Sequence, residues 1–162
     1  MKKILLLCLV VLIAISCVSY TPPSPQNVKD SSYFVMDYDV AFSKIMNWLN
    51  DNDLLVESTD KNAGLIVAKG SLRKIDTDKS GNWAWKSRYS TVAECGECGM
   101  LSNEFPPQRA HLNIIVNKDG NMVKVRVKIL FSEMFPATEC PEYDCISNGK
   151  IERLLFEYLK KK

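Results

Sequence analysis

The sequence has little histidine and no motif that pairs it with a nucleophile. Its single histidine is His111, so any acid–base chemistry that needs an imidazole would depend on this residue alone. Imidazoles that activate a serine or cysteine work beside that nucleophile, and no nucleophile motif accompanies His111. His111 also lies on the polar side of a segment in which polar and apolar residues alternate. We therefore predict a surface histidine and a protein that is not an enzyme.

The sequence lacks an apolar run long enough to span a bilayer, which takes about 20 residues. The run at residues 4–15 is shorter, follows Lys2 and Lys3, and leads into Ala14-Ile15-Ser16-Cys17. A basic start, a short apolar stretch and small residues are typical of a secretory signal. The last four residues resemble the lipobox of bacterial lipoproteins. An ordinary cleaved signal and an uncleaved inner-membrane helix are the alternatives.

The lipobox resemblance implies that residues 1–16 are a signal peptide and that Cys17 becomes the first residue of the mature chain. Its sulfur would be diacylated, and its amine would carry a further acyl chain such as palmitate. Three chains would hold the protein on the membrane far more firmly than one, which binds only marginally. Val18, rather than aspartate, follows the cysteine. In bacteria with two membranes, the resemblance to lipoproteins without aspartate at this position implies that the protein is sorted to the periplasmic face of the outer membrane.

The sequence also lacks a block of charge of one sign. Without the signal peptide, Lys2 and Lys3 are lost, so the 21 basic residues become 19 and balance the 19 acidic ones. The lysines at 160–162 suit the end of a helix, where cations are favoured. A neutral chain with no other basic block lacks the electrostatic footprint of a nucleic-acid-binding protein. We predict no nucleic-acid partner.

The domain organisation follows from composition. Residues 17–32 contain Pro22, Pro23 and Pro25 among polar residues, which favours an acylated, disordered tether. At about 3.1 Å per residue, this tether would hold the domain on the order of 40 Å from the lipid. Residues 33–162 are a natural size for a single domain.

Hydrophobic periodicity predicts an α+β domain, with an antiparallel meander sheet of about five to six strands and two helices packed on it. Apolar residues at helical spacing predict helices at 39–51 and 148–160, the second capped by Ser147 or Asn148. Alternation and turn residues predict the strands, with hairpin connections at 60–64 and 117–121. The predicted strands cover residues 33–36, 54–58, 65–69, 83–94, 110–117 and 122–131.

The strand at 83–94 carries Trp83, Trp85 and Tyr89 on one face, because these positions alternate with Ala84 and Lys86. Two interpretations are open. The aromatic side chains either cover the core beneath the helices or form a contact surface for a ligand or partner.

Four cysteines remain in the domain: Cys95, Cys98, Cys140 and Cys145. An even number of cysteines in an exported protein indicates disulfides, here two that staple the loops. If strands 83–94, 110–117 and 122–131 alternate in direction, loops 95–109 and 132–146 lie at the same end of the sheet. We therefore predict bridges from Cys95 or Cys98 to Cys140 or Cys145, since closing longer loops removes more unfolded-state entropy. Local pairing is the alternative.

The cysteines also support two other hypotheses. Four thiolates would suit a tetrahedral zinc site, but the step from Cys140 to Cys145 is longer than the usual ligand spacing. Cys95-Gly96-Glu97-Cys98 resembles a thioredoxin-type redox pair, yet no helical pattern follows it to lower the thiol pKa. We predict no metal and no cofactor.

The arrangement of elements carries a second resemblance. The lipobox, the strand-helix-strand-strand opening, and the segment from Cys145 to Glu152 before an amphipathic helix resemble a group of small uncharacterised bacterial lipoproteins. The arrangement is also similar to the helix-grip domains of the accessory lipoprotein of the outer-membrane β-barrel assembly machinery. These resemblances imply a noncatalytic, lipid-anchored binding or scaffolding module of the cell envelope. Its partner would be an envelope protein or an apolar ligand.

Overall fold

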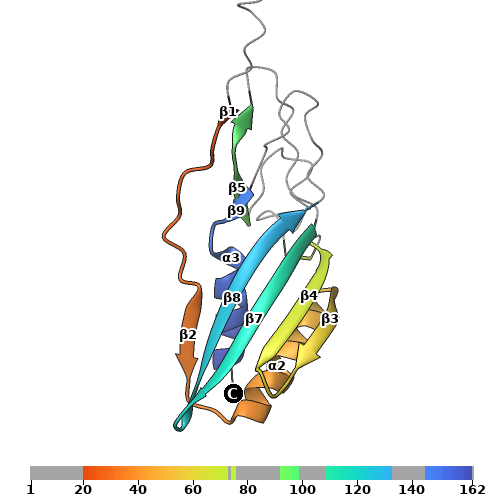
Figure 1. Cartoon of the computed structure of the whole chain (residues 1–162), viewed down its shortest axis with the longest axis vertical. Helices are drawn as coiled ribbons and strands as arrows, with labels where there is room; N and C mark the ends of the chain where they lie inside the picture. Colours follow the sequence, from red (N-terminus) through yellow and green to blue (C-terminus); the bar gives the residue numbers. More distant parts are fainter. Residues whose placement is uncertain (1–19, 73, 76–91, 99–108, 133–144, 162) are drawn as a thin grey trace, which may run out of the picture.

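Two helices cover one face of a five-stranded antiparallel sheet (Figure 1). The computed structural model describes residues 20–72, 74–75, 92–98, 109–132 and 145–161. The strand order is β2-β8-β7-β4-β3. This architecture confirms the predicted α+β class. The strands, in the order of the sheet, are β2 (Ser31–Phe34), β8 (Met122–Ser132), β7 (Arg109–Asp119), β4 (Leu65–Ser71) and β3 (Leu54–Asp60).

The core lies between the helices and the inner face of the sheet. In β7 the side chains of Leu112, Ile114 and Val116 are at most 1% exposed, while the residues between them are more accessible. The same alternation runs along β8, where Val123, Val125 and Val127 are buried. Because side chains of a strand point alternately to its two faces, this pattern fixes which face the helices cover.

Helix α2 (Tyr38–Asp51) places Ile45 and Leu49, both fully buried, against the sheet. Helix α3 (Lys150–Lys160) begins two residues later than predicted, after Gly149 rather than after Ser147 or Asn148. The backbone of Gly149 has a φ of +86°, a conformation that glycine adopts readily and that turns the chain into the helix. Neither described helix is long and apolar enough to cross a membrane.

The hairpin between β7 and β8 is tighter than the predicted five-residue turn. Asp119 pairs with Met122, so only Gly120 and Asn121 connect the strands. Gly120 has a φ of +61° and Asn121 does not have a positive φ, which is the pattern of a type II′ turn. The strands are therefore longer than residues 110–117 and 122–131.

The position of the predicted strand at 83–94 in the meander is wrong. β7 pairs with β4 on one side and with β8 on the other, so no further strand adjoins it in this sheet. Residues 76–91 lie outside the described residues. The end of the segment, β5 (Ala93–Cys95), instead pairs with β9 (Cys145–Ser147) in a separate two-stranded ladder.

The domain begins earlier than the predicted residue 33. Ser31 and Ser32 belong to β2 and pair with Arg126 and Val125, so the prediction of a disordered tether through residue 32 is wrong at this end. β1 (Tyr20–Thr21) also pairs with β6 (Glu97–Cys98). Composition did not reveal these pairings because they use backbone hydrogen bonds, which polar residues form as well as apolar ones.

Candidate interaction surface

The sheet face opposite the helices, here called the outer face, is uncovered over much of the described structure. Adjacent strands are in register, so the rows of outward-facing residues can be followed from strand to strand. One row joins Leu130, His111 and Lys69, and another joins Arg126, Ile115 and Leu65. The outer-face side chains on β8 and β7 are Lys124, Arg126, Lys128, Leu130, His111, Asn113 and Ile115.

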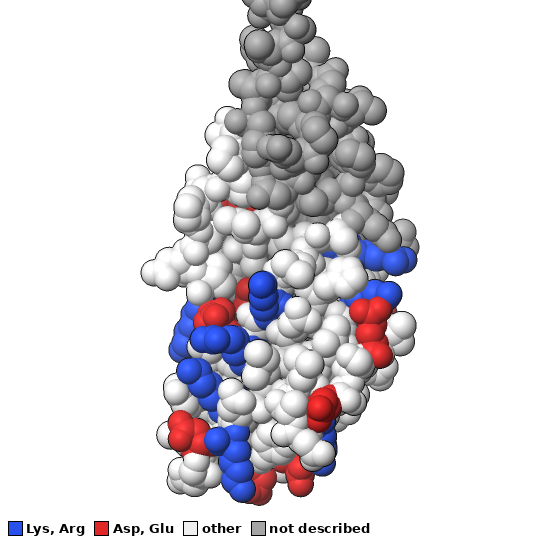
Figure 2. Space-filling view, viewed as in Figure 1, with Lys and Arg blue, Asp and Glu red and all other residues white. Residues whose placement is uncertain are grey.

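The β8 side of the outer face is basic. Lys124, Arg126 and Lys128 occupy alternate positions of one strand, so their Cα atoms lie about 7 Å apart along it. Figure 2 shows several blue side chains over this side of the face, with some red ones among them and white surface through the middle of the face. Arg126 forms an exposed ion pair with Asp30, with 3.4 Å between Nε and Oδ2. The ammonium of Lys124 lies 5.3 Å from the centroid of the Tyr33 ring, within range of a cation–π contact.

Apolar side chains lie beside these cations and remain accessible to solvent. Leu130 is 50% exposed, Tyr33 52% and Ile115 36%. Scattered exposed apolar residues are ordinary, but here they share one face with a row of cations. A surface that combines apolar contacts with charge of one sign is suited to binding a partner of opposite charge.

The β3 side of the outer face is neutralised by its own ion pairs. Glu57 lies where the register between β3 and β4 shifts, and it forms an ion pair with Lys69 of the neighbouring strand. His111 Nδ1 lies 3.9 Å from Glu57 Oε2. The side chain of His111 is 40% exposed, as predicted for a surface histidine. On the β8 side Asp30 pairs with Arg126, and Lys124 and Lys128 make this side the more basic part of the face.

A groove of about 420 Å³ lies on the other side of the molecule. It separates helix α3 from the N-terminal strap, which we define as residues 22–30. Lys29, Arg153 and Lys160 line it together with Glu157, and all four side chains are exposed. The outer face presents exposed apolar side chains beside its cations, so it is the stronger candidate.

Helix α3 holds a buried carboxylate near its first turn. Glu152 is 3% exposed, and Ser147 Oγ donates a hydrogen bond of 2.8 Å to its Oε2. The Ser147 oxygen in turn accepts a hydrogen bond from the Gly149 amide. Burial raises the pKa of the Glu152 carboxyl above its ordinary value, and the Asp30 carboxylate raises it further. Hydrogen bonds from the Glu152 amide and Ser147 oppose this rise.

This pKa shift predicts a pH-dependent gain in stability for Glu152→Gln. A raised pKa means that the folded state holds the proton more tightly, so the contribution of Glu152 to stability is lost as pH rises through its folded pKa. The glutamine variant avoids burying a charge. Its stability relative to the wild type should therefore increase as the pH rises above about 4.3, the ordinary pKa of glutamate, as measured by urea unfolding.

The control is Glu157→Gln, which removes the same charge from an exposed position of the same helix. Comparing the two variants separates the effect of burial from that of net charge. If both variants show the same dependence on pH, the buried carboxylate is not responsible.

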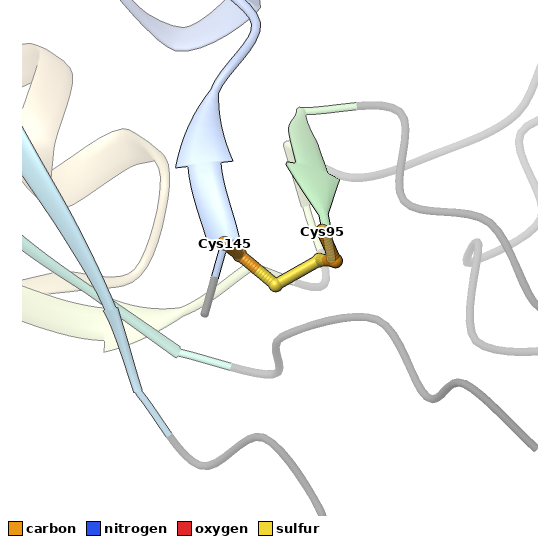
Figure 3. The surroundings of a disulfide bond; sticks show 2 residues. All are labelled: Cys95 and Cys145. Atoms are coloured by element: carbon orange, nitrogen blue, oxygen red, sulfur yellow. A yellow bond between two sulfur atoms is a disulfide. The ribbon is translucent and has the colours of Figure 1, made fainter. Parts of the chain in front are cut away.

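One of the predicted disulfides joins the ends of the two loops (Figure 3). Cys95 in β5 is bonded to Cys145 in β9, 50 residues further along the chain, with 4.0 Å between their Cα atoms. The prediction of a bridge across the two loops is confirmed. Arg109 pairs with Ser132, so the first loop ends and the second begins at the same end of the sheet.

The other predicted site residues are not brought together by the described structure. Cys98 lies in β6, where its backbone pairs with Tyr20, and nothing is described of its side chain. The sulfur of Cys95 is bonded to Cys145 and not to Cys98. The remaining predicted residues lie outside the described residues: Cys17, Cys140, Trp83, Trp85 and Tyr89.

Sequence reasoning missed the outer face as a candidate surface. Its signal was visible, because Lys124, Arg126 and Lys128 alternate with buried valines along one strand. That alternation was used only to place the strand. The alternation along one strand does not specify whether helices cover one face of the sheet or both.

Within the part of the chain that the structure describes, no three His, Cys, Asp or Glu side chains are grouped to hold a metal ion. The comparison with protein-family models and with curated proteins finds no match to this chain.

Proposed function

We propose that this protein is a lipid-anchored lipoprotein of the cell envelope that acts as a noncatalytic binding or scaffolding module. Its lipid would be attached to Cys17, and its outer face would bind an envelope protein with an acidic surface. The observation that carries the proposal is the uncovered outer face. There, exposed apolar side chains lie beside the basic row of β8.

Charge complementarity gives the chemistry of the partner. Lys128 is exposed and continues the row formed by Lys124 and Arg126. Opposite charges accelerate encounter and fix orientation, whereas buried apolar contacts supply most of the affinity. Leu130 and Ile115 provide such contacts next to the cations. The aromatic residues Trp83, Trp85 and Tyr89 remain part of the proposed contact surface.

Two other functions receive less support. A thiol–disulfide enzyme that uses Cys95 and Cys98 would exchange a bond between these two sulfurs, but Cys95 is bonded to Cys145. A carrier of an apolar ligand would hold it between helix and sheet. That interface contains fully buried side chains such as Ile45 and Leu49 packed against Leu112 and Ile114.

The binding surface is tested by photocrosslinking in cells of the source bacterium. A photoreactive phenylalanine analogue replaces Ile115 or Leu130 on the outer face, and Val40 on α2 serves as the control, since it is 46% exposed on the helical side. We expect one acidic envelope protein to crosslink from both outer-face positions and not from Val40. Equal crosslinking from all three positions, or none from the outer face, would contradict the proposal.

The role of charge is tested with two single charge reversals. Lys128→Glu acts on the outer face, whereas Lys160→Glu changes another exposed lysine, at the end of α3. We expect Lys128→Glu to weaken binding of the crosslinked partner by about 10-fold, and Lys160→Glu to leave it within about twofold. Added salt should narrow this difference. Equal effects of the two substitutions would refute the assignment of the basic row.

The lipid anchor is tested separately by metabolic labelling with an alkyne-bearing fatty acid. The wild-type protein should incorporate the label and sediment with membranes, while Cys17→Ser should do neither. Labelling that persists in Cys17→Ser would place the lipid elsewhere.

A further inference from the structure

We infer that the β1–β6 end of the molecule faces the lipid surface, so that the chain after Cys17 fixes the position of the domain instead of acting as a long tether. The inference rests on the proposed acylation of Cys17. It places the membrane-facing surface at one end of the fold. It also fixes how the outer face is oriented relative to the membrane.

The first observation is the position of β1. Tyr20 pairs with Cys98, and Thr21 pairs with Glu97. Tyr20 is three residues after Cys17, and an extended chain spans at most about 3.6 Å per residue. The Cα atoms of Cys17 and Tyr20 are therefore separated by at most about 11 Å. A lipid on Cys17 would bring the β1–β6 ladder close to the membrane.

The second observation is that the strap contacts the domain at three positions, Gln26, Val28 and Asp30. Gln26 Nε2 donates a hydrogen bond of 2.5 Å to Glu94 Oε2. The side chain of Val28 lies beside Gly149, and the carbonyl oxygen of Asp30 accepts a hydrogen bond of 2.8 Å from the Val127 amide. These contacts occupy the residues that would otherwise supply the reach of a free tether. The spacing of about 40 Å expected for an extended chain is thus replaced by a short link.

The third observation connects β1 to the core. β6 follows β5 after the single residue Gly96, and β5 is held to β9 by three paired residues and by the Cys95–Cys145 bond. β9 continues within three residues into helix α3, whose Ile151 and Leu155 are fully buried. A lipid attached three residues before β1 is therefore coupled to the folded core through hydrogen bonds and one covalent bond.

The orientation of the domain follows from this coupling. In Figure 1, β1 lies near the upper end of the described part of the chain and the β7–β8 turn lies at its lower end. β8 contains 11 residues and, at about 3.3 Å per residue, extends roughly 35 Å. Gly120 would then be the part of the sheet farthest from the lipid. The outer face would run away from the membrane, where its partner can reach it from the aqueous side.

The test measures distance from lipid headgroups in the acylated full-length protein. The purified lipoprotein is placed in phosphatidylethanolamine–phosphatidylglycerol nanodiscs in which a fraction of the headgroups carries a gadolinium chelate. Paramagnetic broadening is then recorded for backbone amides by nuclear magnetic resonance. We expect several-fold stronger broadening at Thr21 and Glu97 than at Gly120 and Asn121.

A matched variant carries 12 flexible Gly and Ser residues inserted between Ser19 and Tyr20, which adds roughly 20 Å of root-mean-square reach. The insertion leaves the folded domain unchanged and should reduce the difference between the two ends. Equal broadening at both ends of the wild-type domain, with the protein bound to the nanodisc, would overturn the inference while leaving the lipid anchor intact. Purified protein without the mass of the lipid would overturn both.

Discussion

Replacing Gly64 with alanine is expected to destabilise the protein by about 3 kcal/mol or more, because two separate costs coincide there. The backbone of Gly64 has a φ of +69°, which costs an alanine about 1–2 kcal/mol. An added Cβ would also lie 2.0 Å from the carbonyl oxygen of Val116. That oxygen belongs to the backbone of β7 and cannot move without disturbing the sheet.

The close approach of Gly64 to the backbone of Val116 connects a turn to the central strand of the sheet. The Val116 amide donates a hydrogen bond of 2.8 Å to the carbonyl oxygen of Gly64, just before β4 begins to pair with β7. Asp60 shapes the preceding turn, since its Oδ1 accepts hydrogen bonds from the amides of Asn62 and Ala63. Gly64 thus joins the β3–β4 turn to the central strand, and an alanine there would force β4 and β7 apart.

Gly120→Ala is the matched control. Gly120 has a similar φ of +61°, but a Cβ at this position would meet nothing within 4 Å. Its substitution should cost about 1–2 kcal/mol, from backbone conformation alone. Urea unfolding of the two variants measures the difference. If Gly64→Ala fails to fold while Gly120→Ala folds, the result is the extreme form of the one expected. Equal destabilisation of the two variants would contradict the steric argument.

Local patterns in the sequence predict most of this fold. Helix α2 begins one residue before the predicted start at 39, because the spacing of its apolar residues is a local signal. The strands β7 and β8 were predicted to within two residues of their ends for the same reason. What local patterns could not supply is which strands pair. β4 and β7 are adjacent in the sheet but separated by 37 residues of chain, and no periodicity specifies that contact.

The candidate site was predicted less well than the fold. The cysteine pairs were predicted to meet, because the directions of the strands place their loops at one end of the sheet. The outer face was not predicted, because an exposed row of cations is also the ordinary solvent side of a strand. It becomes a candidate only when both helices are known to lie on the opposite face. That knowledge requires the packing of elements that are distant in sequence.

The second large effect is expected when the Cys95–Cys145 bond is removed. The two cysteines are 50 residues apart, and a loop of that length gives about 4 kcal/mol of stabilisation by restriction of the unfolded chain. The double variant Cys95→Ala/Cys145→Ala should therefore lose about 2–4 kcal/mol of unfolding free energy, measured with urea. The β7–β8 hairpin has its own buried contacts, so circular dichroism without denaturant should show the sheet preserved.

The double variant Cys98→Ala/Cys140→Ala is the control, since it keeps the Cys95–Cys145 bond. If Cys98 and Cys140 form a second bridge, the first one already closes most of the chain between them. The second bridge then removes little additional entropy, and its loss should cost less. Peptide mapping of the oxidised wild type must also recover a peptide that joins Cys95 to Cys145. Recovery of Cys95 joined mainly to Cys98 would contradict this prediction and would favour redox exchange between the two cysteines.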